Sequence, residues 1–200
     1  MTFQLILVCS LLLGTALADG NPYTAEVGTQ DGWMDTVHKF ERQAEMFGSL
    51  LKAVFLGDSY QQKWQTTGLP IWLTKYQLAP SGNLGIDGDK TQNVLWRVEN
   101  ASISNINVKV LVLEVGGANI EAGDAPADIA QGIRNILNRV QVILPGIKII
   151  LNSIIPQANE QLDAKIQETN QLISAFADNE TIFYLDLTSV FETGLGQTRR

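Results

Sequence analysis

Residues 51–59 read LKAVFLGDS, an apolar run that changes abruptly to Gly57, Asp58 and Ser59. The same plan recurs at residues 108–119, where VKVLVLEV is followed by Gly-Gly-Ala-Asn. Strands that helices cover on both faces read as short, nearly continuous apolar runs, because neither face meets water. Both stretches therefore predict interior strands of a parallel sheet, each ending in a small, polar turn.

Three more strands are predicted around these two. One ends near Asn83, Leu84 and Gly85, one covers residues 147–151, and the last covers residues 181–187. The segments between the strands have apolar residues three and four positions apart, which places them on one face of a helix. A helical stretch containing Trp64 follows the first strand. The other predicted core faces are Trp33, Val37, Phe40, Ala44 and Phe47; Val94, Leu95 and Val98; Ile129, Ile133, Ile136, Leu137 and Val140; and Leu162, Ile166, Ile173 and Phe176.

Strand and helix alternate five times, which predicts an α/β fold. Right-handed crossovers then give a three-layer, doubly wound, five-stranded parallel sheet in the flavodoxin-like order 2-1-3-4-5. The site of such a sheet lies at the carboxyl ends of the strands, beside the point between strands 1 and 3 where the order reverses.

The composition fits one folded domain. Of the 200 residues, 45% are hydrophobic and 18% are charged, which suffices for one well-buried core and excludes a disordered chain. The formal net charge of -7 argues against a nucleic-acid partner, because such a surface needs clustered lysine and arginine. The composition leaves the oligomeric state open.

The first eighteen residues have the features of a secretory signal peptide. An apolar stretch over residues 5–17 leads into Ala16-Leu17-Ala18, a small-x-small cleavage pattern, so Asp19 is the expected first mature residue. This stretch is shorter than the ~20 residues of a membrane-spanning helix, and we expect no transmembrane anchor. An uncleaved N-terminal anchor is the alternative, because no lysine or arginine precedes the apolar stretch.

Two other features agree with a secreted, extracellular protein. The tripeptides Asn100-Ala-Ser and Asn179-Glu-Thr predict N-glycosylation at Asn100 and Asn179. The single cysteine, Cys9, lies inside the signal segment, so no disulfide is expected to stabilise the mature chain.

Clusters of glycine and polar residues follow the first three strands, at residues 57–59, 85–89 and 116–119. A serine in a tight strand-to-helix turn exposes its hydroxyl as a nucleophile. A glycine-rich turn lets a backbone N–H approach an oxyanion, and an asparagine can add a side-chain donor. Alone, Gly-Asp-Ser is more often a helix cap. In this order on three successive strands, the clusters predict a site for acyl transfer.

The same clusters lie in blocks that resemble the SGNH, or GDSL, hydrolase family. Residues 33–64 look like the opening of these enzymes, and NLGIDGDKTQNVLWRVEN at residues 83–100 resembles the second block of the platelet-activating-factor acetylhydrolase catalytic subunits. YLDLTSVF at residues 184–191 resembles the last strand before the family's Asp-x-x-His block. The resemblance implies hydrolysis of a small-molecule carboxylic ester of lipid or carbohydrate, often an acetyl ester, through a serine acyl-enzyme.

Carried over by position, the resemblance assigns Ser59 as the nucleophile and Gly88 as an oxyanion donor. The family's third block reads Gly-x-Asn. An alignment without a gap places Ala118 at this asparagine, whereas one inserted residue brings Asn119 into register, with Gly117 as the block's glycine. We favour the insertion and expect Asn119 to supply the side-chain donor.

The family's Asp-x-x-His pair has no counterpart in residues 192–200. Asp186 belongs to the strand motif, and the only histidine, His38, lies midway along the first predicted helix, where we expect a structural role. We therefore expect a signal peptide at 1–18, a loose lead at 19–31, and an SGNH hydrolase-like domain at 32–200 that lacks its last block. Such a chain would be weakly active or inactive as an esterase; the alternative is a non-catalytic secreted binding protein.

Other site types fit poorly. Residues 85–91 lack the Gly-Lys pair of a phosphate loop, and Asp87 and Asp89 lack the glycine and glutamate spacing of a calcium loop. One histidine and no mature cysteine argue against zinc, so we expect neither a metal nor a cofactor. Trp64 and Trp72 could line an acyl or sugar pocket, although buried packing is the commoner use of tryptophan.

Overall fold

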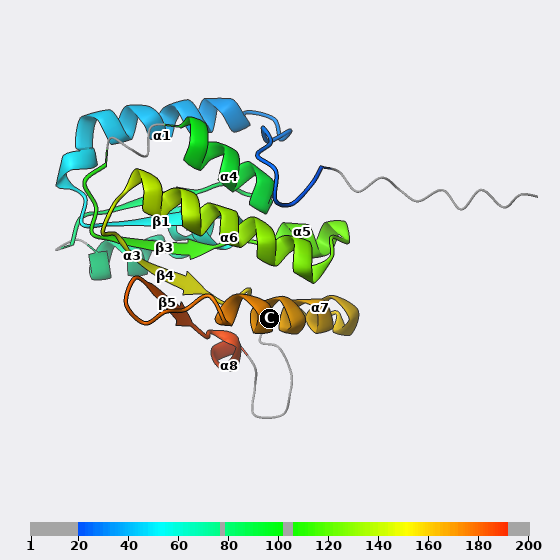
Figure 1. The fold of residues 1–200 in the computed structure, drawn as a ribbon. Helices are drawn as coiled ribbons and strands as arrows, with labels where there is room; N and C mark the ends of the chain where they lie inside the picture. The colour runs from blue at the N-terminus through cyan, green and yellow to red at the C-terminus, as the bar shows by residue number, and fades with distance from the viewer. Residues whose placement is uncertain (1–19, 77–78, 102–105, 192–200) are drawn as a thin grey trace, which may run out of the picture.

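A computed structural model describes residues 20–76, 79–101 and 106–191. Five parallel strands form one sheet in the order β2-β1-β3-β4-β5, which confirms the predicted fold class and strand order (Figure 1). The strands are β1 (Ala53–Gly57), β2 (Ser81–Gly85), β3 (Val110–Glu114), β4 (Lys148–Asn152) and β5 (Ile182–Leu185). The predicted signal peptide and Cys9 lie outside the described residues.

The register of the sheet brings the first three strand ends to one level. Gly57 of β1 pairs with Gly85 of β2 on one side and with Glu114 of β3 on the other. The chain therefore leaves these strands at one edge of the sheet. The three polar clusters meet at this edge, as the sequence predicted.

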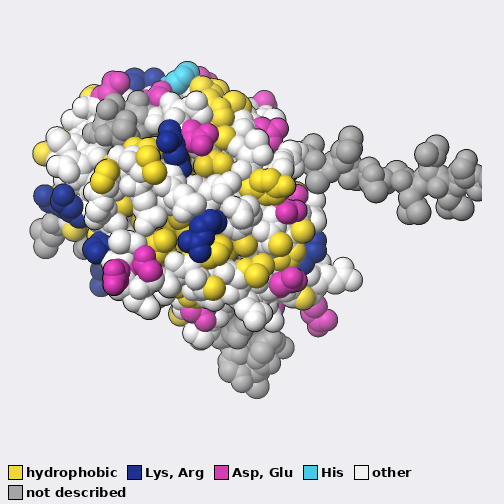
Figure 2. All heavy atoms as spheres, in the orientation of Figure 1, with side chains coloured by type: hydrophobic (Ala, Val, Ile, Leu, Met, Phe, Trp, Pro, Cys, Tyr) yellow, Lys and Arg dark blue, Asp and Glu magenta, His cyan; other side chains and the backbone are white. Residues whose placement is uncertain are grey.

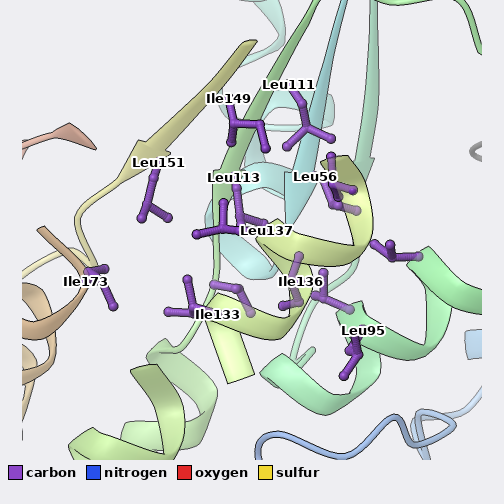
Figure 3. Close-up of a cluster of buried hydrophobic side chains, with 14 of the residues drawn as sticks. Leu56, Leu95, Leu111, Leu113, Ile133, Ile136, Leu137, Ile149, Leu151 and Ile173 are labelled. Carbon is purple, nitrogen blue, oxygen red and sulfur yellow. The ribbon is translucent and has the colours of Figure 1, made fainter. Parts of the chain in front are cut away.

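One face of the sheet carries the main core. The helices α4 (Thr91–Asn100), α6 (Pro126–Ile143) and α7 (Glu160–Ser174) cover it. Figure 3 shows Leu56 and Leu113 of the sheet meeting Ile133 and Leu137 of α6. These side chains are at most 1% exposed, and burying each contributes about 1.5–3 kcal/mol to folding.

The helix α1 (Trp33–Phe47) packs beside α4 (Figure 1). Trp33, Val37 and Phe40 are buried as predicted, and the Trp33 ring meets Trp96 of α4 edge to face, with the ring centroids 5.4 Å apart. The prediction that Phe47 lies in the core is wrong, because its side chain is 51% exposed. It instead lines an apolar groove at the end of α1.

The other face of the sheet is covered over β1. The helical stretch predicted around Trp64 consists of three short helices, α2 (Ser59–Gln62), η2 (Lys63–Gln65) and α3 (Leu69–Tyr76). Phe55 of β1 packs edge-on against Trp72 and Tyr76 of α3. Toward β5 this face is more open, since Phe183 and Leu185 are 37% and 46% exposed.

The lead segment before α1 has no helix or strand, but the described part of it is not loose as predicted. The Thr91 hydroxyl donates to the carbonyl of Pro22, and the Glu26 N–H donates to the carbonyl of Gln92. Asn135 of α6 also donates to the carbonyl of Tyr23. These contacts attach the segment to α4 and α6.

Three short helices complete the described fold: η1 (Gly48–Leu50), α5 (Gly117–Ala122) and α8 (Thr188–Phe191). The sequence did not predict them, because a helix of one or two turns is too short to display a periodic apolar face. Among the described helices, none is both long and apolar enough to cross a lipid bilayer.

Candidate active site

The nucleophile turn lies between β1 and α2. Ser59 is the first residue of α2 and is partly exposed, while Asp58 before it is buried and accepts a hydrogen bond from the Tyr60 N–H at 3.2 Å. Gly57 is needed where the strand ends, because a Cβ there would lie 1.9 Å from the Glu114 carbonyl oxygen. The turn thus holds the Ser59 hydroxyl at the carboxyl edge of the sheet.

Gly88 lies in the loop after β2, next to this serine. Its backbone N–H donates to Ser59 Oγ at 3.1 Å. Its φ of +75° is in the left-handed region, which a residue with a Cβ rarely adopts. The structure therefore brings together the two residues to which the resemblance gave the roles of nucleophile and oxyanion donor.

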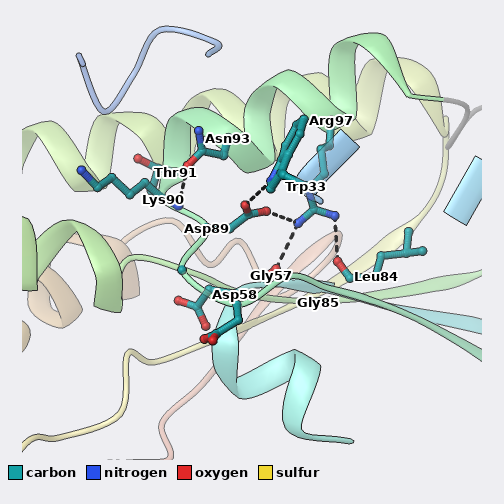
Figure 4. Close-up of polar contacts among 12 residues, drawn as sticks. Trp33, Gly57, Asp58, Leu84, Gly85, Asp89, Lys90, Thr91, Asn93 and Arg97 are labelled. Carbon is teal, nitrogen blue, oxygen red and sulfur yellow. Dashed lines mark hydrogen bonds and ion pairs between the residues drawn. The ribbon is translucent and has the colours of Figure 1, made fainter. Parts of the chain in front are cut away.

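A buried network that the sequence reasoning missed joins the first two loops (Figure 4). Arg97 of α4 forms an ion pair with Asp89 at 2.7 Å and donates to the carbonyl oxygens of Leu84, at 2.7 Å, and Gly57, at 3.0 Å. The Trp33 indole N–H donates to the other Asp89 oxygen at 2.6 Å. Burial raises the pKa of the Asp89 carboxyl, and the Arg97 charge and the Trp33 N–H oppose that rise.

This network fixes the loop that carries Gly88, because Asp89 is the next residue and is fully buried. A signal for it exists in the sequence. Arg97 is three residues after Val94 and one before Val98, so the helix spacing places a charge on the apolar face. A buried charge needs a partner, and Asp89 supplies it.

The third loop corrects the prediction for Asn119. Its side chain is buried in α5, where Oδ1 accepts from the Thr91 N–H at 2.8 Å. Its Nδ2 donates to Gln92 Oε1 at 3.0 Å and to Asp124 Oδ2 at 2.8 Å. The Thr91 N–H can only donate and a carboxylate only accepts, so this amide orientation is fixed. With both N–H groups used, Asn119 has no donor left for an oxyanion.

The conformation of the third loop also distinguishes the two alignments of the family's Gly-x-Asn block, with and without an inserted residue. Gly116 has a φ of +125°, and α5 begins at Gly117, so Ala118 and Asn119 lie on different sides of the same short helix. Asn119 is fully buried, whereas Ala118 is partly exposed. This arrangement favours the alignment without a gap, in which Ala118 takes the place of the family's asparagine.

Two buried carboxyl groups lie at the floor of the site. Desolvation raises the pKa of Asp58 to about 7 and that of Glu114 to about 8, and the charge of Asp58 adds to the rise at Glu114. Glu114 Oε2 accepts from Gln61 Nε2 of α2 at 3.0 Å. With these pKa values, the floor holds much less negative charge at neutral pH than two ionised carboxylates would, so it repels a developing oxyanion less.

The only histidine of the sequence, His38, is exposed on α1 (Figure 2, cyan atoms). It lies one residue from Val37, which faces the core, and it is outside the hydrogen-bond network around Ser59. Asp186 after β5 accepts from the backbone N–H and the hydroxyl of Thr188, at 2.9 and 2.6 Å, and so caps α8. Neither residue is placed as a base or as its orienting acid.

Both sequon asparagines are exposed. Asn100 ends α4, and its side chain donates to the carbonyl of Trp96; Ser102 of that sequon lies outside the described residues. Asn179 lies in the turn before β5, with a φ of 58°. Glycosylation at these positions stays a prediction.

Residues 55–200 match the sequence profile of the GDSL-like Lipase/Acylhydrolase family. This chain belongs to that family. The GDSL-like match begins inside β1, two residues before Gly57, and so includes Ser59, Gly88 and the third loop.

Curated relatives agree with the GDSL-like assignment. The chain is 30% identical over 176 residues to platelet-activating factor acetylhydrolase IB subunit alpha1 of Bos taurus, covering 84% of this chain and 73% of the relative. It is 31% identical over 146 residues to the subunit beta homolog of Drosophila melanogaster, covering 72% of this chain and 62% of the relative. The aligned chain thus spans less than two thirds of the fly protein.

Solved structures show the same fold. A GDSL-like lipase from Bacteroides thetaiotaomicron superposes with a TM-score of 0.65 at 19% identity, covering 80% of this chain and 82% of that one. A member of the lipolytic G-D-S-L family from Veillonella parvula gives 0.60 at 16% identity, covering 74% and 90%.

Proposed function

We propose that this chain is a secreted serine hydrolase scaffold for carboxylic esters, with Ser59 as the nucleophile. The observation that carries the proposal is the 3.1 Å hydrogen bond from the Gly88 N–H to Ser59 Oγ at the carboxyl edge of the sheet. When Ser59 attacks an ester carbonyl, the carbonyl oxygen becomes an oxyanion beside the attacking atom. The N–H groups of Gly88 and Ser59 are then the donors for it.

The reaction would proceed in two steps. Ser59 Oγ forms a bond to the acyl carbon, its proton passes to a base, and the alcohol leaves to give an acyl-enzyme. Water then attacks the acyl carbon and releases the acid, which regenerates Ser59. The raised pKa values of Asp58 and Glu114 favour the oxyanion of both steps, because the two carboxyl groups carry less negative charge near it at neutral pH than two ionised carboxylates would.

The described residues do not supply the base that accepts the proton of Ser59. A serine hydroxyl is mostly protonated at neutral pH, so fast attack needs a base within hydrogen-bond reach. Because His38 is exposed on α1, we propose that the 200-residue chain hydrolyses esters weakly. Binding and oxyanion donors alone can leave about 10³–10⁴-fold catalysis over water.

The substrate class follows from the relatives. Their names describe platelet-activating factor acetylhydrolase subunits, so an acetyl ester of a lipid is the first candidate. The second candidate, an acylated sugar, rests only on the resemblance of the sequence to the wider hydrolase family. The exposed position of the only histidine also favours a second function, that of a secreted protein that binds such an ester without turning it over.

Chemical rescue tests the esterase proposal on the chain as it exists. Free imidazole should act as the external base and raise p-nitrophenyl acetate hydrolysis by wild type well above that by Ser59→Ala. The Ser59→Ala comparison is essential, because imidazole hydrolyses this ester by itself. Equal rates in the two proteins would contradict Ser59 as the nucleophile and favour the binding function.

A fluorophosphonate probe tests the claim of weak activity separately. The probe reports an activated serine, so it should label Ser59 poorly in the absence of imidazole. Strong, stoichiometric labelling that disappears in Ser59→Ala would contradict weak activity and would require another base.

A further inference from the structure

A second concave site runs along the edge strand β2. It has a volume of about 480 Å³ and is bounded by α1, β2, η2 and α3, and neither Ser59 nor Gly88 lines it. Small-molecule sites have volumes of about 300–1,000 Å³, whereas gaps between packed side chains seldom exceed one water molecule. The groove is therefore large enough for a ligand.

The walls of the groove are apolar and nearly uncharged. Phe40 and Phe47 of α1 line one side, and Trp64 and Trp72 line another. Among the described lining residues, Glu41 is the one with a formal charge, so no lysine or arginine is present to pair with an anionic group. Desolvating an unpaired carboxylate or phosphate is costly, and such a group would also face Glu41. The lining therefore selects an uncharged, apolar ligand.

The groove extends along both α1 and β2. Its lining extends along α1 from Phe40 to Phe47, which at 1.5 Å per residue is about 10 Å. Along β2 it extends from Ser81 to Leu84, again about 10 Å at the rise of a strand. These spans leave room for a segment of an alkyl chain.

The mouth of the groove is apolar and open to solvent. Phe47 and Leu69, which both line it, are 51% and 39% exposed. Gln65 and Ser81 add neutral hydrogen-bonding groups to the lining. Exposed apolar side chains at the rim of a cavity are typical of an interaction site.

We propose that this groove binds one alkyl or acyl chain of an uncharged single-chain lipid. The sequence had left open whether Trp64 and Trp72 are packing residues or line a pocket; here both line the groove, and their ring centroids are 6.0 Å apart. The proposal rests on the size and lining of the groove. Binding at this groove does not depend on any role of Ser59.

Tryptophan fluorescence provides the test, because two of the four tryptophans line the groove. The other two, Trp33 and Trp96, meet edge to face between α1 and α4. An uncharged brominated alcohol, ω-bromoundecanol, should quench wild-type fluorescence saturably below its solubility limit. The quenching should be lost when Trp64 and Trp72 are both changed to phenylalanine. The carboxylate of the same length should bind at least about tenfold more weakly, since its charge is unpaired in the groove.

A variant that fills the groove tests whether the quencher binds inside it. Ala44→Phe places a ring in the groove from α1 and should abolish saturable quenching, whereas Val142→Phe, on the exposed side of α6, should bind like wild type. Ala101→Phe fills the groove from the end of α4. If Ala44→Phe does not fold, the loss of saturable quenching is measured with Ala101→Phe instead.

Several results would overturn the proposal. Wild-type quenching in a folded groove-filling variant is one, and tighter binding of the carboxylate than of the alcohol is another. Co-sedimentation with phosphatidylcholine vesicles that needs Phe47 and Leu69, without saturable binding of the alcohol, would assign these residues to a bilayer surface instead.

Discussion

Replacing Arg97 with methionine would remove the buried cation that links the first two loops of the site. Arg97 is 2% exposed and contacts Asp89, the Leu84 carbonyl and the Gly57 carbonyl. Methionine keeps an unbranched apolar stem of similar length, so packing along α4 is largely retained. The variant therefore isolates the loss of the guanidinium group.

The expected loss of stability is large. Removing one partner of a buried ion pair costs about 3–5 kcal/mol, because the remaining charge stays buried without compensation. Two backbone carbonyls also lose a donor, which places the value toward the upper end of that range. Such a loss is a large fraction of the about 5–15 kcal/mol that stabilises a typical domain.

Urea unfolding followed by circular dichroism measures this loss. Arg42→Met, at an exposed position of α1, is the matched control and should change the free energy of unfolding by at most about 0.5 kcal/mol. Adding Asp89→Asn to Arg97→Met removes the unpaired charge while the Trp33 N–H keeps its acceptor. The double variant should therefore be more stable than Arg97→Met alone, by about 1–3 kcal/mol.

Two results would refute this reasoning. A loss below about 1 kcal/mol in Arg97→Met would mean that water replaces the guanidinium contacts. A double variant no more stable than the single one would mean that the Asp89 charge is not the source of the loss.

Four further outcomes are expected. Burial raises the pKa of Glu114 to about 8. The contribution of Glu114 to the free energy of unfolding is therefore complete below the unfolded-state pKa near 4.5 and is lost as the pH rises to about 8. Urea midpoints of the wild type should fall between pH 5 and 8, and Glu114→Gln should flatten that fall. Asn119→Ala should cost about 1–3 kcal/mol of stability, measured in urea, because it leaves buried partners unpaired. Ala118→Asn should raise imidazole-rescued turnover by up to about 10²-fold if the ungapped register is right, and an unchanged rate would contradict it. Mass spectrometry of the secreted protein should find Asp19 as its first residue, and an intact Met1 on a membrane-bound product would contradict cleavage after Ala18.

Local patterns in the sequence predicted much of the fold. Continuous apolar runs indicated β1, β3, β4 and β5, whereas β2 (SGNLG) was recognised only by the glycine-rich turn that follows it. The alternation of strands with helical segments then predicted the order β2-β1-β3-β4-β5. Spacing alone also identified the α6 core face, whose Ile129, Ile133 and Val140 are fully buried. These features depend on residues that are neighbours along the chain, which is why a single sequence is enough to predict them.

The site could be predicted only in part. The turn at Ser59 and the loop at Gly88 follow strands, so the register of the sheet brings them to one edge whatever the detailed packing. The role of Asn119 could not be predicted from the register of the sheet. A shift of one residue within α5 decides whether a side chain is partly exposed, like Ala118, or buried, like Asn119. The buried partners of Asn119 come from the start of α4 and from Asp124 after α5.

The sequence by itself determined the strand order, most of each core face and the place of the nucleophile turn, because each depends on spacing along the chain. The tertiary structure alone decided that Arg97 and Asp89 pair beneath the loops and that the donors of Asn119 are already used. It also decided that Trp64 and Trp72 line an open groove. These outcomes depend on how separate loops and helices pack against one another, and the spacing of residues within one segment does not specify which partner each side chain meets.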